Sequence, residues 1–240
     1  MKKAITLLAV LTVSIVSAQW GQKKIKGDGN VVSKSITTAD YDAIGVAGAF
    51  HVTLVEGTEG KITVKGEENL LEYVVIETNG SDLKIKTEKG YNLNPSKGKK
   101  IEIIVPVKEI SAVSLAGSGD IVADFTIKSS SFKTSLAGSG DIKLHVNSDT
   151  VEASLSGSGD IKLSGKTKNL EANLSGSGDI KAVELMAEKS KANLSGSGNI
   201  STTCSEFIEA RVAGSGHIEY KGNPKKIDTK VAGSGKIKMI

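Results

Sequence analysis

A seven-residue segment, Leu174-Ser-Gly-Ser-Gly-Asp-Ile180, recurs seven times with small changes in the second half of the chain. Successive copies are 18 to 21 residues apart. A fixed period of this length indicates one supersecondary unit per repeat, stacked on its neighbours. Each unit is too short to bury an apolar face alone, so the units must share one core. The first glycines of the copies are Gly117, Gly138, Gly157, Gly176, Gly196, Gly214 and Gly233.

Apolar and polar residues alternate strictly around each copy. Leu170, Ala172 and Leu174 occupy every second position, and the two glycines and Ile180 continue the same phase. A period of two predicts β-strands, and nothing in the repeats has helical spacing. The glycines therefore fall in the inward-facing set, where they mark a bend or a close backbone approach. The serines and the aspartate fall in the outward-facing set.

One wound coil per repeat explains this pattern better than a series of hairpins, because the repeats lack paired turn signals. A coil of about 19 residues has a contour of roughly 60 Å at the rise of a strand. Each strand would pair with its equivalent one repeat later. The sequence thus predicts an all-β protein, a right-handed parallel β-solenoid (β-helix).

The first residues resemble a targeting segment. Lys2 and Lys3 precede an apolar run over residues 4–16, and a small-residue cleavage site ends at Ala18. This predicts a signal peptide at 1–18 and an exported protein of the periplasm, the outer membrane surface or the extracellular space. Loss of both lysines lowers the formal net charge from +4 to +2. That balance predicts no nucleic-acid partner.

We divide the mature chain into a leader segment at 19–40 and a single solenoid domain at 41–240. Residues 44–54 repeat the inward phase of the later coils, with Phe50 in place of the second glycine, and are predicted to form a degenerate first coil. Residues 55–107 break the period and are predicted to form a β-hairpin insertion sheet, with turns at 57–60 and 79–82. Regular coils occupy 111–240. The last coil reaches Ile240 with no polar cap, which predicts self-association of the chain into a homo-oligomer there.

These residues resemble a known family of exported bacterial proteins, the putative auto-transporter adhesin head GIN domain family (DUF2807). The resemblance rests on the exported leader, on the segment from Tyr41 to Val52, on Leu83-Lys-Ile-Lys and on the serial Gly-Ser-Gly-Asp-Ile copies. It covers nearly the whole mature chain. The resemblance implies a β-solenoid and a putative adhesin, and it brings no catalytic residues with it.

Two outward columns are the candidate site. The first is a column of serines that we interpret as a ligand face: Ser118, Ser139, Ser158, Ser177 and Ser197. The second is a column of carboxylates about 4.8 Å apart: Asp120, Asp141, Asp160 and Asp179. Three things could offset their repulsion: hydrogen bonds from backbone amides at the bend, weakly bound Ca²⁺, or proton uptake. No other cofactor is expected.

Catalysis is not predicted. The acidic residues form a repeated row rather than the positioned pair that glycoside hydrolysis uses. Aromatic residues make up only 4% of the chain, and the three histidines lie far apart in sequence. Cys204 is the only cysteine and has an inward phase, which favours a buried thiol. Two Lys-rich segments, Lys97–Lys100 and Lys221–Lys226, are interpreted as solvated loop charge, with weak contact to anionic polysaccharide or lipid headgroups as the alternative.

The sequence alone thus favours an exported, non-catalytic surface or periplasmic module. It would act in adhesion or assembly through the repeated Ser/Asp face, with a protein or glycan partner at the cell surface. The alternative is a carbohydrate-binding or carbohydrate-active β-helix protein.

Overall fold

The computed structural model describes residues 21–240. The predicted signal peptide at 1–18 and the first residues of the leader lie outside the described part of the chain. Within the described residues, no helix has the length and apolar character that crossing a membrane requires.

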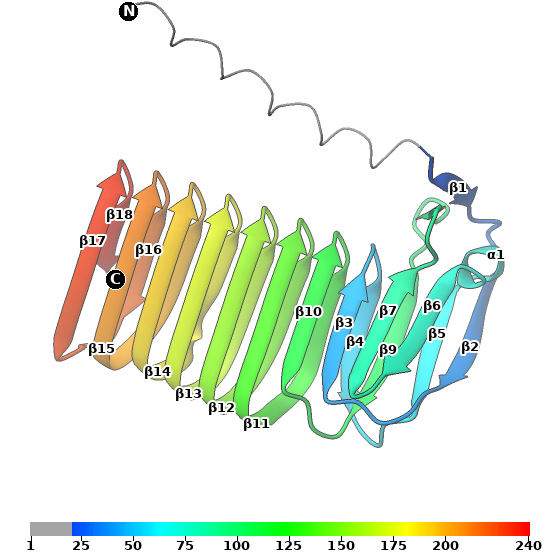
Figure 1. The fold of residues 1–240 in the computed structure, drawn as a ribbon, viewed down its shortest axis with the longest axis horizontal. Coiled ribbons are helices and arrows are strands. Elements are labelled where there is room, and N and C mark those ends of the chain that lie inside the picture. The colour runs from blue at the N-terminus through cyan, green and yellow to red at the C-terminus, as the bar shows by residue number, and fades with distance from the viewer. Residues whose placement is uncertain (1–20) are drawn as a thin grey trace, which may run out of the picture.

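Five long strands form the middle of the molecule, and each follows the chain almost once around a coil (Figure 1). Successive strands pair in parallel, and equivalent repeat positions meet: Gly138 lies opposite Gly157, and Leu155 opposite Leu174. The winding confirms the predicted right-handed parallel β-solenoid. The five strands are β11 (Asp120–Gly138), β12 (Asp141–Gly157), β13 (Asp160–Gly176), β14 (Asp179–Gly196) and β15 (Asn199–Gly214).

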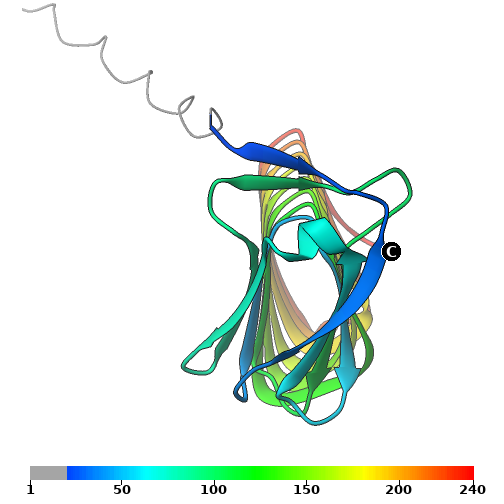
Figure 2. The same cartoon turned by 90° about the vertical axis from the view of Figure 1, so that its right-hand side faces the viewer.

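Each coil has two walls that meet at a narrow corner and are joined at the other edge by a rounded base (Figures 1 and 2). We call the wall that leads to the Gly-Ser-Gly corner the ascending wall and the wall that leaves it the descending wall. Alternate side chains of both walls point between them and form one buried core. Leu170, Ala172 and Leu174 are each at most 3% exposed, as their phase predicts.

The first coil is degenerate, as predicted. Strands β3 (Ala43–Ala47) and β4 (His51–Glu56) pair in parallel with β10 (Ala112–Gly117) and with the start of β11. Phe50 stands where later coils have their second glycine and is 1% exposed. At the other end, the last coil consists of β16 (His217–Lys221), β17 (Lys226–Gly233) and β18 (Lys236–Met239).

The segment before the regular coils contains one of the two predicted hairpins. Strands β6 (Val74–Asn79) and β7 (Asp82–Thr87) pair antiparallel around the turn at 79–82, and β7 extends the ascending wall beside β3. The short helix α1 (Glu68–Leu71) precedes them.

The hairpin predicted at 57–60 is wrong. Strand β9 (Glu102–Val107) lies between β4 and β5 (Lys61–Glu67), parallel to the first and antiparallel to the second. The apolar side chains of Ile103 and Val105 bury completely in that position. Strand β9, which is distant in sequence, therefore takes the place beside β4 that β5 would occupy in a hairpin.

The leader is also paired. Strand β2 (Val31–Thr37) runs antiparallel to β5, and β1 (Lys23–Lys26) runs parallel to β8 (Tyr91–Asn94). Strand β8 directly precedes the loop that contains Lys97–Lys100. These additions cover the first end of the solenoid (Figure 2).

Candidate functional site

The glycines of each corner set how closely successive coils approach. Gly176 has a φ of 136°, a backbone conformation that residues other than glycine rarely adopt. A Cβ on Gly178 would fall far inside contact distance of the Gly159 carbonyl oxygen and 3.0 Å from Leu155 Cδ2. The predicted bend and close backbone approach are both present. The second glycine is buried and the first is partly exposed in every pair except the last, in which Gly233 is exposed and Gly235 partly exposed.

The serine column lies on this corner and is exposed along its whole length. The backbone N–H of Ser177 donates to the carbonyl oxygen of Gly157 at 2.9 Å, and the other coils repeat the contact. Within residues 21–240, the hydroxyl groups of Ser118, Ser139, Ser158, Ser177 and Ser197 make no hydrogen bond to the protein. The column therefore presents unpaired hydroxyl groups to solvent.

The aspartate column is in register, with Asp120 opposite Asp141, then Asp160, then Asp179. An oxygen of Asp141 accepts from the backbone N–H of Asp160 at 3.2 Å, and Asp160 accepts from Asp179 in the same way at 3.3 Å. Lys181 forms ion pairs with Asp160 and with Asp179. These amide and lysine contacts offset the repulsion between stacked carboxylates.

The column has a histidine at its first end. His51 Nδ1 lies 2.7 Å from a carboxylate oxygen of Asp120. In the described part of the chain, no group of three or more His, Cys, Asp or Glu side chains is arranged to hold a metal ion. Weak Ca²⁺ binding by Asp120, Asp141, Asp160 and Asp179 stays a prediction.

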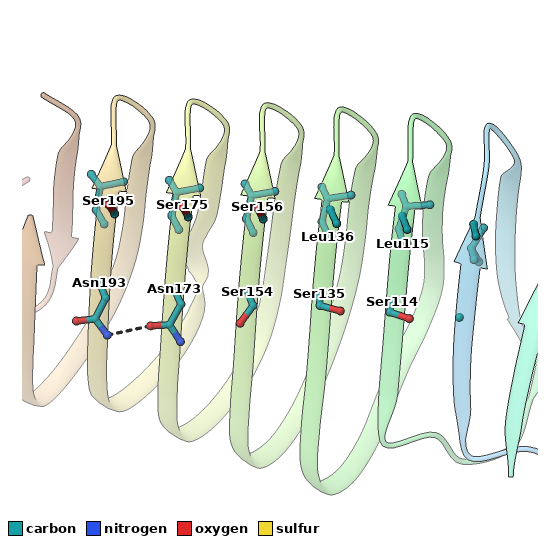
Figure 3. A pocket seen from close by; sticks show the side chains of 18 of the residues that line it. Ser114, Leu115, Ser135, Leu136, Ser154, Ser156, Asn173, Ser175, Asn193 and Ser195 are labelled. Carbon is teal, nitrogen blue, oxygen red and sulfur yellow. Dashed lines mark hydrogen bonds between the residues drawn. The ribbon is translucent and has the colours of Figure 1, made fainter. Parts of the chain in front are cut away.

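A groove of about 950 Å³ runs along the outer face of the ascending wall, directly before the corner (Figure 3). Two rows of short side chains line it, and the backbone of the buried leucines lies between them. The row farther from the corner contains Ser114, Ser135, Ser154, Asn173 and Asn193; the nearer row contains Ala116, Ala137, Ser156, Ser175 and Ser195. Asn193 Nδ2 donates to Asn173 Oδ1 at 2.9 Å, which ties two coils together.

The groove crosses nine strands, from β7 to β17, which is about 38 Å at the spacing of paired strands. Its volume lies at the upper end of the range for ligand sites. Basic side chains stand at both ends: Lys84 and Lys86 on β7, and Arg211 and Lys230 near the last coil. Arg211 bonds to Asp228 at 2.7 Å, and this contact raises the pKa of the guanidinium and lowers that of Asp228.

The sequence pattern predicts the corner columns but not this groove. Between its basic ends, the groove is lined by outward-facing alanines, serines and asparagines, and these residue types do not indicate a binding site. In the sequence they are distinguished only by their shared position directly before the Gly-Ser-Gly corner. Cys204 is buried as predicted, and burial raises the pKa of its thiol, so it offers no reactive thiolate.

Comparison with known protein families identifies the family of this chain. A family described as "Putative auto-transporter adhesin, head GIN domain" (DUF2807) matches residues 40–224. No curated protein matches the chain.

Several solved structures share the fold over about nine tenths of this chain. A putative adhesin from Bacteroides fragilis is 22% identical, with a TM-score of 0.81, over 90% of this chain and 100% of its own. A putative lipid binding protein from Parabacteroides distasonis is 29% identical, with a TM-score of 0.76, over 91% and 100%. A putative adhesin from Parabacteroides merdae is 22% identical, with a TM-score of 0.71, over 90% and 99%.

Proposed function

Because the chain belongs to the head GIN domain family of putative auto-transporter adhesins, we propose that it is an exported, non-catalytic module that holds a surface partner along the repeated outer face of its coils. The partner lies in the groove of the ascending wall and reaches the serine column at the corner. The observation that carries this proposal is the groove itself, about 950 Å³ in volume and continuous over nine strands.

The shape of the groove favours an extended partner. Side chains on its floor are short, so the surface is long and shallow, and each of the middle coils presents the same backbone flanked by Ala, Ser or Asn. A linear glycan or an extended peptide segment can make equivalent contacts at successive coils, whereas a compact ligand would use only one or two. Weak contacts repeated along one chain add up through effective concentration.

The lining also argues against hydrolysis of a bound glycan. Glycoside cleavage uses two carboxyl groups on either side of the scissile bond. The residues that line the groove include no Asp or Glu. The aspartate column lies beyond the corner, on the descending wall, where its oxygens are engaged by backbone amides and Lys181.

A binding panel combined with a turnover assay tests the proposal. The purified chain is applied to an array of surface glycans and, in parallel, mixed with polysaccharides whose cleavage is followed by reducing ends. We expect stable binding without turnover. Turnover without stable binding would support the alternative function, that of a carbohydrate-active β-helix protein. Because one similar structure carries the name lipid binding protein, the panel includes phospholipids.

Two variants test whether the partner binds in the groove or at the corner. Ser154→Trp fills the middle of the groove, and Ser158→Trp puts the same bulk on the corner of the same coil. The groove variant should lose most of the binding, and the corner variant should lose less. The opposite order would move the site to the serine column, and unchanged binding in both would remove this face from the proposal.

We also propose self-association through the last coil. The side chains of Ile227 and Val231 on β17 and of Met239 on β18 are 53%, 42% and 61% exposed. Among the described residues, β17 pairs only with β15, and β18 only with β16. A second copy would cover these side chains and pair the open strand edges. Light scattering should show a dimer that Val231→Glu disrupts. A monomer at high concentration would contradict this.

A further inference from the structure

Seven lysines gather at the N-terminal end of the solenoid from two segments that are more than 60 residues apart in sequence. Pairing of β1 with β8 brings them together, with Lys24 opposite Asn92 and Lys26 opposite Asn94. Gly27 N–H then donates to the Asn94 carbonyl at 3.0 Å. We call this surface the basic cap, and it consists of Lys23, Lys24, Lys26, Lys89, Lys97, Lys99 and Lys100.

The basic cap carries an excess of positive charge over the nearby carboxylates of Glu67 and Asp28. All seven lysines are exposed, and in the described chain none of them forms an ion pair with a carboxylate. Residues 21–27 and 88–100 contain one acidic residue, Glu88, against these seven lysines. The coils differ: Lys133 pairs with Glu152 at 2.8 Å and Lys191 with Glu171 at 3.1 Å, each across one coil step. The cap is thus a region of concentrated positive charge on a chain whose formal net charge is only +4.

The basic cap is held in place by a buried carboxylate. Glu67 is 1% exposed, and its oxygens accept from Gly29 N–H at 2.6 Å and from Ser96 N–H at 2.8 Å. Asn69 donates its side-chain N–H to the carbonyl oxygen of Lys26 at 2.7 Å. Ile25 and Leu93 pack against the core beneath the lysines. Because the backbones of both segments are anchored, the lysines are held at the same end of the molecule.

We propose that the basic cap docks the protein, by its N-terminal end, onto a lipid surface rich in anionic headgroups. Clusters of four to eight Lys or Arg near a membrane surface are sufficient for such attraction, at a Debye-screened range. The cap contains lysine alone, and lysine acts as a point charge that needs no matched partner geometry. None of its residues lines the groove of the ascending wall or the smaller pocket at 56, 107–110 and 125–128. These features favour a diffuse charged plane over a glycan bound by specific hydrogen bonds.

This inference does not depend on the groove, since no lysine of the cap lines it and the ascending wall stays open for a separate partner. The test is flotation of the purified mature chain with vesicles of phosphatidylglycerol and phosphatidylcholine, with pure phosphatidylcholine vesicles for comparison. We expect binding to the anionic vesicles only, and its loss at high salt.

A matched pair of variants assigns the binding to the cap. The first replaces Lys24, Lys97 and Lys100 by Gln. The second replaces Lys128, Lys166 and Lys189, which are exposed at the base of the coils and unpaired among residues 21–240, by Gln as well. Both keep the same N-terminus and the same net charge. Affinity for anionic vesicles should fall on the order of 100-fold in the first variant and change little in the second.

Three results would overturn the proposal: no flotation of the unchanged protein, equal loss in both variants, or equal binding to neutral vesicles. Binding to a soluble polyuronate but not to anionic vesicles would assign the cap to an anionic glycan instead. Circular dichroism and the midpoint of urea unfolding confirm that each variant is folded before its binding is compared.

Discussion

At the scale of single residues, the second glycine of each corner is the most constrained position in the repeat. Gly178→Ala would place a Cβ into the backbone of the preceding coil, at Gly159, and 3.0 Å from Leu155 Cδ2. We expect a loss of about 3 kcal/mol or more in the free energy of unfolding, at the upper end of overpacking effects. The matched control is Gly57→Ala, whose nearest neighbour would be Pro106 Cβ at an ordinary 3.5 Å. Urea unfolding compares the two, and equal stability would contradict the stacking of glycine on glycine.

Glu67 makes the attachment of the leader dependent on pH. Burial alone would raise the pKa of its carboxyl group, but hydrogen bonds from Ser96 and Gly29, with the charge of Lys99, lower it overall. A carboxyl group whose pKa is lower in the folded state stabilises the protein above its unfolded pKa. That stability is lost as the pH falls through the folded value, so it disappears in the acid range below about pH 4.

Glu67→Gln should therefore destabilise the protein at pH 7, by about 1–3 kcal/mol, because one of the two backbone amides loses its acceptor. At pH 3 the difference between the variant and the unchanged protein should shrink. Urea unfolding at both pH values measures this, and hydrogen exchange at Gly29 and Ser96 localises it. A difference that is the same at both pH values would show that the charge of the carboxylate is not what holds the leader.

At the scale of elements, the aspartate column shows what successive coils do for one another. Asp141, Asp160 and Asp179 each accept from the backbone amide of the next coil, so these carboxylates link neighbouring strands at the corner. Because those oxygens are engaged, we expect millimolar Ca²⁺ to raise the Tm no more than Mg²⁺ at the same ionic strength. A Ca²⁺-specific rise that Asp160→Asn removes would instead establish the cation site.

The regular coils could be predicted because their information is local and repeated. The alternation around Leu170 and Leu174 fixes which face is buried, and the paired glycines fix where the wall bends. The hairpin of β6 and β7 was also predictable, because Asn79-Gly80 is a strong turn signal. The position of β9 between β4 and β5 was not, since it is decided by burial of Ile103 among residues about 50 positions earlier.

The candidate binding surfaces were harder to predict for the same reason. The serine and aspartate columns follow from the repeat and were found. The groove depends on the absence of long side chains at Ser135 and Ala137, and absence is a weak sequence signal. The basic cap depends on the pairing of Lys23–Lys26 with Tyr91–Asn94, which no local pattern indicates because both segments are short and polar.

At the scale of the whole molecule, stability is a sum over coils and the interfaces between them. Each long strand contacts its immediate neighbours much more than any other element, so the rod behaves as a one-dimensional array. The first end is covered by β1, β2, β5 and α1, whereas the side chains of β17 and β18 are exposed. Amides in the last coil should therefore exchange with solvent sooner than those in β12 and β13, and the order of exchange should follow distance from that end.

An inserted coil tests this additivity directly. A second copy of residues 160–178 placed after Gly178 adds one full repeat, with the same glycines, aspartate and inward leucines as its neighbours. Because a new coil brings its own interface, the urea midpoint should rise, and the rod should lengthen by about 4.8 Å in small-angle scattering. The groove lengthens with it, so affinity for an extended partner should also rise. The control is the same insertion with alanine at both corner glycines, which cannot stack and should lower the midpoint. A neutral insertion would mean that the coils do not contribute independently.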